Sequence, residues 1–579
     1  DIIMPYEYSE LYFNKLLLES NKPIFINNVS VASFDENSGL NGINQNVINL
    51  YNTFFTNNNI KCLNFRDDKS LAFFKNKINY NDNLSINSYV DIAFSLPIDK
   101  DFYGLKNNKK ALLIIRYNKN NDYQKYKKII NYIKLNNYKY SILSVSLYGT
   151  EYEHEQTIQK YFDENIIFKK TLDEVINVIR NYDLIFTSRF HGHIIGLLYG
   201  KVSFSISNNN KFETLNNMLL IKNYDSSNIE YNNLTKYLCD EDILKKYVNI
   251  SNKMIDNLKA NIIKECFKIT HYGSYYLNDN DIVKQYVNML KLHCKVNEVD
   301  LNIYKSQDNY IKHHYKDWRI CREVKKNEFT LKNVKDSNII IVNSGNLFLS
   351  NELKELFNQK IIINNQFSDP DVFEYIQNYV DDYDYIFSNS IFSVNEQYKN
   401  KNTHHLLMTC SSDYFKNYIP FEERKNTVSI IGAYRKDRES YVKELINKTS
   451  HNINLYGKKW DKMSINADFV SNETLVEVYN NTKIYISFGK TMAGYYNIKV
   501  GLFEAISCGC CIFTDAKEIF KYFNEDEIVY FNSPNDLVSK INSIIVNNTA
   551  ENYAKKSHSK FLKLYQLDAK ILDSLKLLL

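Results

Sequence analysis

Apolar, β-rich runs alternate with longer amphipathic stretches along almost the whole chain. In the first half such runs occupy residues 23–32, 111–117, 140–149, 183–188 and 202–207. In the second half they occupy residues 338–345, 360–366, 383–390, 426–434, 453–457, 482–489 and 509–515. Strands that alternate with helical segments predict βαβ units and parallel sheets, so the expected fold class is α/β. Because ligands bind beyond the carboxyl ends of parallel strands, the residues after each run are the first candidates for a functional site.

The sequence divides in two near residue 265. A chain of 579 residues exceeds what one ordinary core accommodates, so at least two domains are expected. Residues 240–265 favour one long helix, after which the alternation begins again. Residues 557–579 show a second long amphipathic helical pattern. We therefore expect two tandem α/β domains, 1–265 and 266–579, each closed by a C-terminal helix.

Composition excludes several classes of protein. A hydrophobic fraction of 44% favours globular folding, and a net charge of +5 gives no support for a nucleic-acid partner. No run of apolar residues is long enough to predict a membrane span. The nine cysteines show no zinc spacing and favour thiols in a reducing compartment, the cytoplasm, or the host cytoplasm if the source is viral. The chain opens on Asp1 rather than Met, which leaves open a segment upstream.

Charged side chains stand at strand ends in the first half. Arg116 ends one run, Arg189 and His191 follow another, and Asp91 follows a shorter one. Two arginines can bind a doubly charged anion, and a histidine beside them can transfer a proton near neutral pH. A helix that starts near Gly192 would add its N-terminal amides. These residues predict an anion site with a proton donor.

At these residues the sequence resembles the polysaccharide pyruvyl transferases. The stretch DLIFTSRFHGHIIGLLYGKVSFSIS (183–207) is similar to their RxHG signature. Other segments follow in the family's order: NFRDDKSLAFF (64–74), VDIAFSLP (90–97), LLIIRYN (112–118) and a downstream lysine, Lys211. The resemblance covers roughly residues 1–260.

The resemblance implies transfer of pyruvate from phosphoenolpyruvate to sugar hydroxyls, which forms a ketal. It implies that His191 is the general acid and that Arg189 and Arg116 hold the phosphate and the carboxylate. It further implies a substrate-binding set of Gly192, Lys211 and Asp91. The sequence departs from the family in two places, because the chain begins after the expected glycine-rich loop and because Lys201 and Val202 replace the x-Pro of its Gly-x-Pro.

Other interpretations of the first half stay open. Arg189 and His191 can form a turn satisfied by backbone carbonyls. Arg66 beside Asp67 and Asp68 favours a structural ion pair, and His193 favours a packing or surface role. The first domain can also be a divergent glycosyltransferase or a catalytically inactive carbohydrate-binding scaffold.

The informative stretch of the second half is YYNIKVGLFEAISCGCCIFTD, residues 495–515. Glu504 lies within a predicted helix, where its carboxylate can accept hydrogen bonds from a ribose diol. Gly509 suits the C-terminal cap of that helix. This F-E-A-x-x-x-G arrangement resembles the donor half of GT-B glycosyltransferases of the CgeB-like and group 1 types, with coverage of about 266–579.

The second resemblance implies an acceptor half at about 266–424, a donor half at about 425–579 and glycosyl transfer from a nucleotide sugar to a hydroxyl group. Together the two resemblances imply two tandem GT-B-like domains, each of Rossmann-like parallel-sheet subdomains. It implies that residues 489–497 bind the sugar and that no metal or cofactor is required. Basic residues would bind the diphosphate: Arg435, Arg438, Lys458, and Lys499 in place of an arginine expected where Gly501 stands.

The catalytic base of the second domain has three candidates, Asp279, Asp281 and Asp369. The sequence SDPD (368–371) imitates a metal-binding motif, but its position before a helix favours capping. The expected partners are therefore a nucleotide-sugar donor and a glycan or glycoconjugate acceptor. The oligomeric state stays open.

Overall fold

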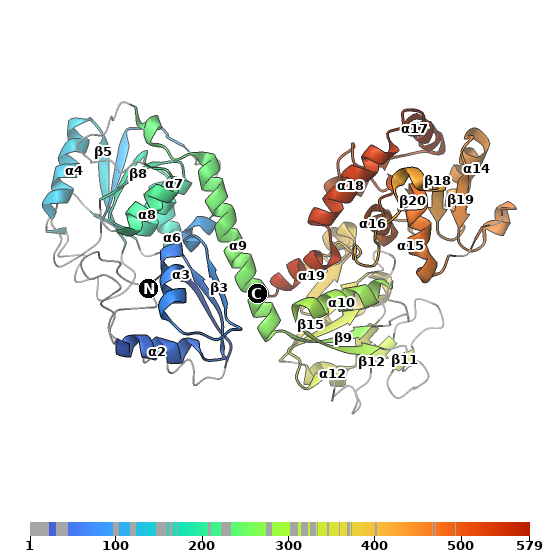
Figure 1. Ribbon diagram of the computed structural model, residues 1–579, viewed down its shortest axis with the longest axis horizontal. Coiled ribbons are helices and arrows are strands. Elements are labelled where there is room, and N and C mark those ends of the chain that lie inside the picture. Colours follow the sequence, from blue (N-terminus) through green and yellow to red (C-terminus); the bar gives the residue numbers. More distant parts are fainter. Residues whose placement is uncertain are drawn as a thin grey trace. The chain divides into compact units, whose positions relative to one another are not determined.

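The computed structural model of the chain divides into two compact units, residues 1–261 and 262–579, each of which is described by itself (Figure 1). The description covers residues 22–30, 45–96, 104–115, 123–145, 159–160, 162, 166–169, 171–206, 210–221, 233–273, 281–300, 311–313, 322–324, 332, 334–343, 347–357, 359–367, 371, 373–399, 402–465, 467–468, 470–491 and 494–579.

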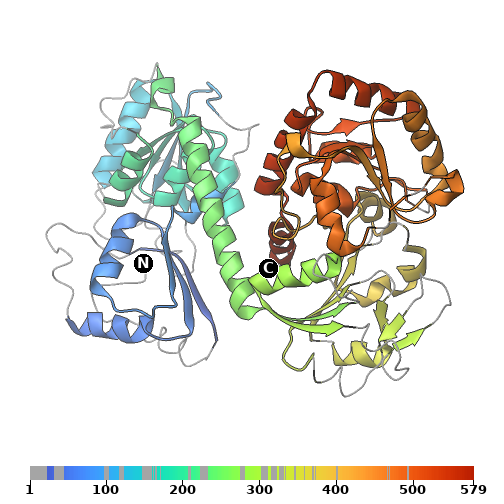
Figure 2. The ribbon, with the colours of Figure 1, turned by 45° about the vertical axis from the view of Figure 1, so that its right-hand side comes forward.

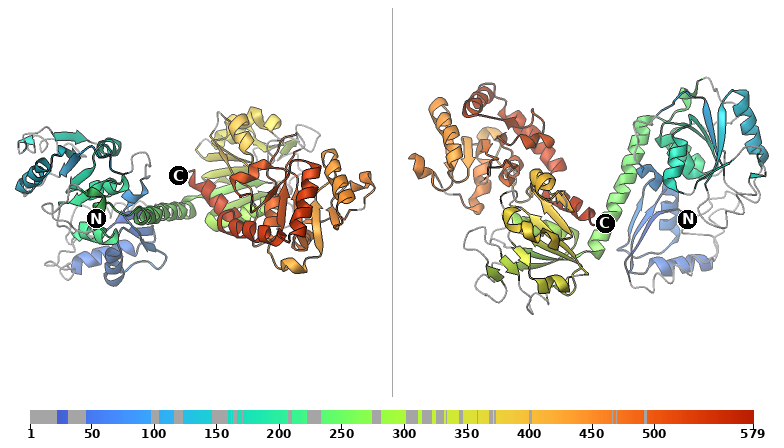
Figure 3. Two further views of the ribbon diagram at one scale, coloured as in Figure 1. Left: turned by 90° about the horizontal axis from the view of Figure 1, so that it is seen from above. Right: turned by 180° about the vertical axis from the view of Figure 1, so that it is seen from behind.

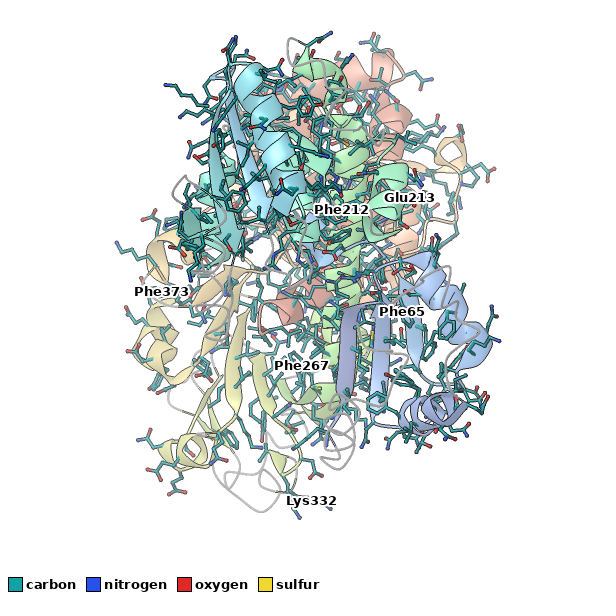
Figure 4. The ribbon with its side chains drawn as sticks, turned by 90° about the vertical axis from the view of Figure 1, so that its left-hand side faces the viewer. Phe65, Phe212, Glu213, Phe267, Lys332 and Phe373 are labelled. Atoms are coloured by element: carbon teal, nitrogen blue, oxygen red, sulfur yellow. The ribbon has the colours of Figure 1, made fainter. Side chains whose placement is uncertain are left out.

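A three-stranded parallel sheet begins the first unit. Its strands β1 (Ile24–Val29), β2 (Ile60–Phe65) and β3 (Ser85–Ser88) lie side by side in that order. Helices α2 (Gln45–Phe55) and α3 (Asp68–Lys77) follow the first two strands. Phe55, Phe65 and Phe74 are buried in the core that the helices form with the sheet. Phe65 is labelled at the end of β2 in Figure 4.

A five-stranded parallel sheet completes the first unit. Its order is β6 (Ile166–Lys169), β5 (Lys139–Val145), β4 (Lys110–Ile115), β7 (Leu184–Thr187), β8 (Val202–Ser205). Its helices are α4 (Tyr123–Leu135), α6 (Leu172–Ile179), α7 (Phe190–Leu198) and α8 (Asn210–Met218). Leu113 of β4 packs with Ile129 of α4, whereas Leu112 packs with Ile176 of α6. Successive side chains of a strand point to opposite faces, so both faces of this sheet are covered.

The long helix expected near residue 250 is present as α9 (Glu241–Cys266). Within the first unit Asn257 of α9 donates a hydrogen bond to the hydroxyl of Tyr89, at 2.7 Å. This contact ties the helix to the residue that follows β3.

A six-stranded parallel sheet begins the second unit. Its order is β10 (Lys295–Asp300), β9 (Lys268–Gly273), β13 (Ile339–Asn343), β15 (Ile361–Gln366), β16 (Tyr385–Ser388), β17 (Thr403–His405). The accompanying helices are α10 (Ile282–His293), α12 (Asn351–Leu356) and α13 (Phe373–Ile376). A smaller sheet consists of β11 (Ile311–His313), β12 (Arg322–Val324) and β14 (Leu347–Leu349).

A five-stranded parallel sheet forms the other half of the second unit (Figure 2). Its order is β19 (Ile453–Tyr456), β18 (Asn426–Ile431), β20 (Thr482–Ser487), β21 (Cys511–Thr514), β22 (Val529–Tyr530). Its helices include α14 (Glu439–Lys448), α15 (Asn472–Asn480), α16 (Val500–Ser507) and α17 (Pro534–Val546). Each unit thus contains two parallel α/β sheets, which confirms the expected GT-B-like α/β architecture.

The prediction of one long C-terminal helix was wrong, because the helix breaks at Tyr565–Gln566. Helix α18 (Ala550–Leu564) ends there and α19 (Leu567–Lys576) begins (Figure 3). The amide of Leu567 donates to the carbonyl of Cys410, and Gln566 donates to the hydroxyl of Ser412 at 2.8 Å. Leu567, Ile571 and Leu575 then join the core of the six-stranded sheet. Docking on that sheet therefore redirects the chain.

None of the helices in the described ranges is long and apolar enough to cross a membrane. Every cysteine in those ranges is an unbridged thiol, and Cys321 lies outside them.

Candidate active sites

Three segments of the first unit meet at Asp91. Arg66 follows β2, Asp91 follows β3 and caps a short 3₁₀ helix, and His191 lies in the first turn of α7 after β7. An Nη1 atom of Arg66 lies 3.6 Å from Oδ2 of Asp91, and Nε2 of His191 lies 3.5 Å from Oδ1. Asp91 therefore connects the carboxyl end of the first sheet to the start of α7.

The environment of Asp91 favours its charged form. Burial alone would raise the pKa of Asp91, but His191, the amide of Ala93 and Arg66 together hold that pKa below its usual value. The side chain of Asp91 is 3% exposed, whereas that of His191 is 61% exposed. The carboxylate is thus a buried anchor, and the imidazole is the part that a substrate can reach.

The interpretation of Arg66 as the ion-pair partner of Asp67 or Asp68 was wrong. Asp67 instead caps α3, accepting hydrogen bonds from the amide and the hydroxyl of Ser70 at 2.7 and 2.8 Å. Arg66 pairs with Asp91 and also donates to the hydroxyl of Ser30 at 2.8 Å. The sequence neighbours of Arg66 could not indicate this, because Asp91 reaches it through the pairing of β2 with β3.

The side chain of Arg189 contacts a backbone carbonyl, as one of the alternative interpretations predicted. Its guanidinium donates to the carbonyl of Val145, at the end of β5, over 2.7 Å. Its amide donates to the hydroxyl of Thr187, which donates in turn to the carbonyl of Arg189. A Cβ on Gly192 would lie 3.1 Å from both Thr187 Oγ1 and Ile114 Cδ1, so this glycine permits close approach of α7 to the sheet.

The remaining candidates of the first unit are Arg116, Lys211 and His193. Arg116 is outside the described residues, and Lys211 lies in the first turn of α8. His193 is fully buried between Ser203 and Asn216, at 2.8 and 2.9 Å, and burial lowers its pKa to about 4. His193 thus has the packing role that the sequence favoured. Phe212, labelled in Figure 4, packs its ring against Phe190.

Two glycine turns meet beyond β18 and β19 in the second unit. Gly432 and Gly457 have φ angles of 141° and 132°, which side chains rarely adopt. A Cβ on Gly457 would lie 2.4 Å from the carbonyl oxygen of Gly432. Trp460 donates its indole N–H to that same oxygen at 2.9 Å. The backbone here is therefore closely packed.

Arg435 and Arg438 follow the first of these turns. Arg435 forms a two-pronged ion pair with Asp437, at 3.1 and 2.8 Å, and donates to the carbonyls of Lys490 and Thr491. Arg438 lies over the ring of Phe488 at 5.4 Å. Lys458, after β19, is exposed.

Lys499 and Glu504 belong to the start and the middle of α16. Burial lowers the pKa of Lys499. Arg435 and Arg438 lower it further, whereas Asp371 raises it. Burial raises the pKa of Glu504 to about 7, although the hydroxyl of Tyr479 donates to it at 3.2 Å. Lys499 therefore lies in a partly desolvated region that also contains the arginines, and Glu504 is buried in the helix that Lys499 begins.

Gly501 explains the missing arginine of this segment. A Cβ at this position would lie 3.1 Å from the hydroxyl of Tyr479 and 3.4 Å from that of Tyr485. A long side chain would have to displace these buried tyrosines. Lys499, two residues earlier, is the cation that the helix start presents instead.

Sequence reasoning missed Arg424, which anchors the end of α16. Its buried guanidinium donates to the carbonyls of Cys508 and Gly509 at 2.7 and 2.9 Å, and to that of Thr482 at 2.8 Å. Carbonyls at a helix C-terminus lack intrahelical donors, so a cation there satisfies them. Gly509 has a φ of 78° and would bring a Cβ within 2.9 Å of Arg424. Gly509 is thus a helix-end residue, as its C-cap prediction required.

Sequence reasoning also missed Asp515, directly after β21. Its Oδ1 accepts from the amide of Gly489 at 2.5 Å, and burial raises its pKa. Of the candidates for a base, Asp281 caps α10, accepting from the amides of Val283 and Lys284. Asp279 and Asp369 are outside the described residues, as is the start of SDPD. No cluster of three or more His, Cys, Asp or Glu side chains that could hold a metal occurs in the described part of the chain.

Comparison with known families confirms both resemblances. Residues 2–210 match the polysaccharide pyruvyl transferase family, and residues 435–574 match a glycosyl transferase-like family. Both families are transferases, so the chain is a transferase with a glycan-modifying role. No curated protein matches the chain.

The chain is similar to several solved structures at low identity. Sucrose-phosphate synthase from Thermosynechococcus elongatus is 12% identical, with 54% of this chain and 98% of that chain covered and a TM-score of 0.39. A glycosyltransferase from Rickettsia africae is also 12% identical, with 54% and 97% covered and a TM-score of 0.37. TarM from S. aureus is 12% identical, with 81% and 99% covered and a TM-score of 0.34.

Proposed function

We propose that the first unit transfers pyruvate from phosphoenolpyruvate to a pair of sugar hydroxyls. The observation that carries this proposal is the convergence of Arg66, Asp91 and His191 from three separate segments. Asp91 anchors one ring nitrogen of His191, Nε2, at 3.5 Å. The other nitrogen, Nδ1, belongs to an exposed ring and is the proton donor.

In this mechanism His191 protonates the methylene carbon of phosphoenolpyruvate, and the adjacent carbon becomes oxocarbenium-like. One sugar hydroxyl attacks that carbon and returns its proton to His191. The second hydroxyl then forms the other C–O bond as the C–O bond to phosphate breaks, and its proton leaves with the phosphate. The product is a ketal with inorganic phosphate released. Arg189 and Arg116 hold the anionic groups, and such fixed cations stabilise the departing charge.

The test is phosphate release and acceptor mass gain on incubation with phosphoenolpyruvate and a panel of oligosaccharides. Wild type should add pyruvate to at least one acceptor. His191→Gln should lose this activity by a factor of about 100 or more, the usual contribution of a general acid. Lys245→Gln on the exposed face of α9 is the matched surface control and should be unaffected. Pyruvyl transfer by His191→Gln at the wild-type rate would show that another residue donates the proton.

Outcomes of the same assay separate the alternatives for this unit. Consumption of a nucleotide sugar that depends on His191 would favour a divergent glycosyltransferase. Oligosaccharide binding without turnover of either donor would favour an inactive carbohydrate-binding scaffold.

The second unit, we propose, transfers a sugar from a nucleotide sugar to a hydroxyl group. What carries this proposal is the gathering of Arg435 and Arg438 near Lys499, beyond β18 and at the start of α16, whose middle contains Glu504. The cations would bind the diphosphate, Glu504 the ribose hydroxyls and residues 489–497 the sugar. Lys458, exposed after β19, can approach the same phosphates.

The corresponding test is calorimetry with a panel of nucleotide sugars, followed by transfer assays. Glu504→Gln should weaken binding of the preferred nucleotide by about 10-fold, since it replaces a charged acceptor of ribose hydrogen bonds. Glu477→Gln on α15 is exposed and serves as the control. A wild-type protein that binds no nucleotide would refute the donor role of this unit.

A further inference from the structure

The segment from residue 104 to residue 145 is strongly basic. Its one acidic residue is Asp122, and its basic residues are Lys106, Lys109, Lys110, Arg116, Lys119, Lys125, Lys127, Lys128, Lys134 and Lys139. The whole chain has a net charge of only +5, so the remainder of the sequence is net negative. The basic charge is thus concentrated in one short part of the first unit.

Helix α4 presents much of this charge to solvent. Lys127, Lys128 and Lys134 are exposed, whereas Ile129 and Ile133 are buried in the core beneath the helix. Figure 1 shows α4 on one side of the five-stranded sheet of this unit. The apolar face of α4 is buried in the core, and its outward face is basic.

Further lysines extend this surface onto the beginnings of two strands. Lys110 of β4 is the register partner of Lys139 of β5, and the amide of Lys139 donates to the carbonyl of Lys109 at 2.9 Å. The ammonium of Lys134 lies 5.3 Å from the ring centre of Tyr140, so the end of α4 adjoins β5. The exposed set is called the lysine face and consists of Lys109, Lys110, Lys127, Lys128, Lys134 and Lys139.

Lys109, Lys110, Lys134 and Lys139 lie at the amino ends of β4 and β5. Lys127 and Lys128 lie nearer the start of α4, where the hydroxyl of Tyr126 donates to that of Ser188. His191, by contrast, follows the carboxyl end of β7, which runs parallel to β4.

The other charged helices neutralise their lysines locally. Lys245 pairs with Glu241 on α9, Lys443 with Glu439 on α14, and Lys555 with Glu551 on α18. Residues Tyr123–Leu135 of α4 contain no acidic residue at all. Lys125 and Lys128 of α4, three residues apart, repel one another, and an external anionic surface would relieve that repulsion.

We propose that the lysine face docks the protein on an anionic lipid bilayer. Two exposed apolar side chains accompany the lysines, Leu135 at 77% and Tyr132 at 37% exposure. Tyrosine rings and apolar tips suit the headgroup region of a bilayer, and lysines bind its anionic lipids. A purely electrostatic polymer site would gain nothing from an exposed leucine. This docking does not depend on either proposed transferase activity.

The experiment is co-sedimentation of the full chain with vesicles of phosphatidylcholine alone or mixed with phosphatidylglycerol. Wild type should bind the mixed vesicles, ignore the neutral ones and dissociate as salt screens the charges. Each lysine at an anionic surface contributes about fivefold to the binding constant. The triple variant Lys127→Gln/Lys128→Gln/Lys134→Gln should therefore bind the mixed vesicles about 100-fold more weakly.

The matched control replaces three exposed lysines of α9: Lys245→Gln/Lys246→Gln/Lys253→Gln. It removes the same charge from the same unit and should bind vesicles nearly as wild type does. Circular dichroism of both triple variants checks that the helices are intact. If the triple variant unfolds, the single variant Lys127→Gln still tests the proposal, and it should bind the mixed vesicles about fivefold more weakly. The proposal fails if wild type does not bind anionic vesicles at low salt, or if both triple variants lose binding equally. It also fails if wild type binds a soluble polyanion such as dextran sulfate but no vesicles.

Discussion

Glu504 is a buried acid beside two buried tyrosines, and its titration links the donor site to folding. Burial raises the pKa of Glu504 from 4.5 to about 7. Between these values the folded protein holds a proton that the unfolded chain has released. The free energy of unfolding therefore falls as the pH rises from about 4.5 to 7, and the contribution is constant above that range. The ionised carboxylate, the better acceptor for ribose hydroxyls, is thus obtained at a cost in stability.

Glu504→Gln should remove this pH dependence, because the amide does not ionise. The free energy of unfolding of the variant, relative to wild type, should increase by on the order of 3 kcal/mol between pH 4.5 and 7. Urea unfolding at a series of pH values measures it, with the exposed Glu477→Gln as control. Parallel curves for Glu504→Gln and wild type would contradict the assignment of the titration to Glu504.

Asp437 competes for the arginine that the proposed diphosphate would use. Its carboxylate holds Arg435 through two hydrogen bonds, and a bound diphosphate would bring further negative charge to the same guanidinium. Asp437→Asn should therefore bind a nucleoside diphosphate more tightly than wild type, by about 3- to 10-fold, since it removes a partly exposed opposing charge. Calorimetry measures the change, and Glu439→Gln, at an exposed ion pair nearby, should leave affinity within about twofold. Weaker binding by Asp437→Asn would show that Asp437 positions Arg435 for the ligand.

Among the elements, the turns after β18 and β19 show how backbone constraint shapes the second site. Gly432 and Gly457 let two strand ends approach so closely that a methyl group cannot fit between them. Arg435 and Arg438 follow Gly432, and Lys458 follows Gly457. The positions of these cations therefore depend on glycines that carry no functional group.

Gly457→Ala and Gly494→Ala separate the two costs of replacing such a glycine. Both residues have a left-handed φ, of 132° and 93°, but only the Gly457 position has a neighbour within 4 Å of an added Cβ. Gly494→Ala should cost about 1 kcal/mol for the backbone conformation, and Gly457→Ala about 2 kcal/mol or more because of the clash. Thermal unfolding of the two variants tests this difference. Equal destabilisation by the two substitutions would mean that the turns at Gly432 and Gly457 move apart to accommodate the added methyl group.

Local pattern predicted the elements of this fold better than their connections. Apolar runs such as residues 183–188 correspond to strands, because central strands such as β7 are covered on both faces and all of its residues are buried. The break between α18 and α19 has no local signal, because the helical periodicity continues through Gln566 and the break arises from docking on Cys410 and Ser412. The pairing of Arg66 with Asp91 was hidden for the same reason. Contacts between distant segments depend on strand order, which a single sequence does not reveal.

At the scale of the whole molecule, each candidate site rests on its own cores. Phe74 is fully buried in the first unit, among the aromatic rings of α2, α3 and β2. Ile571 is fully buried in the second unit, where α19 returns to the six-stranded sheet. The two units are joined in sequence through α9, whose residues lie on both sides of the boundary at 261. Separate cores imply that damage to one unit need not unfold the other.

Calorimetric unfolding of the full chain should accordingly show two transitions. Phe74→Ala should lower one of them and Ile571→Ala the other, because deleting a buried side chain costs about 2–5 kcal/mol in the unit that contains it. Lys245→Gln, at an exposed ion pair, should move neither transition. Activity assigns the transitions functionally, since loss of pyruvyl transfer by the wild type on heating should follow the transition that Phe74→Ala lowers. A single transition shifted equally by both core variants would show that α9 couples the units into one cooperative block.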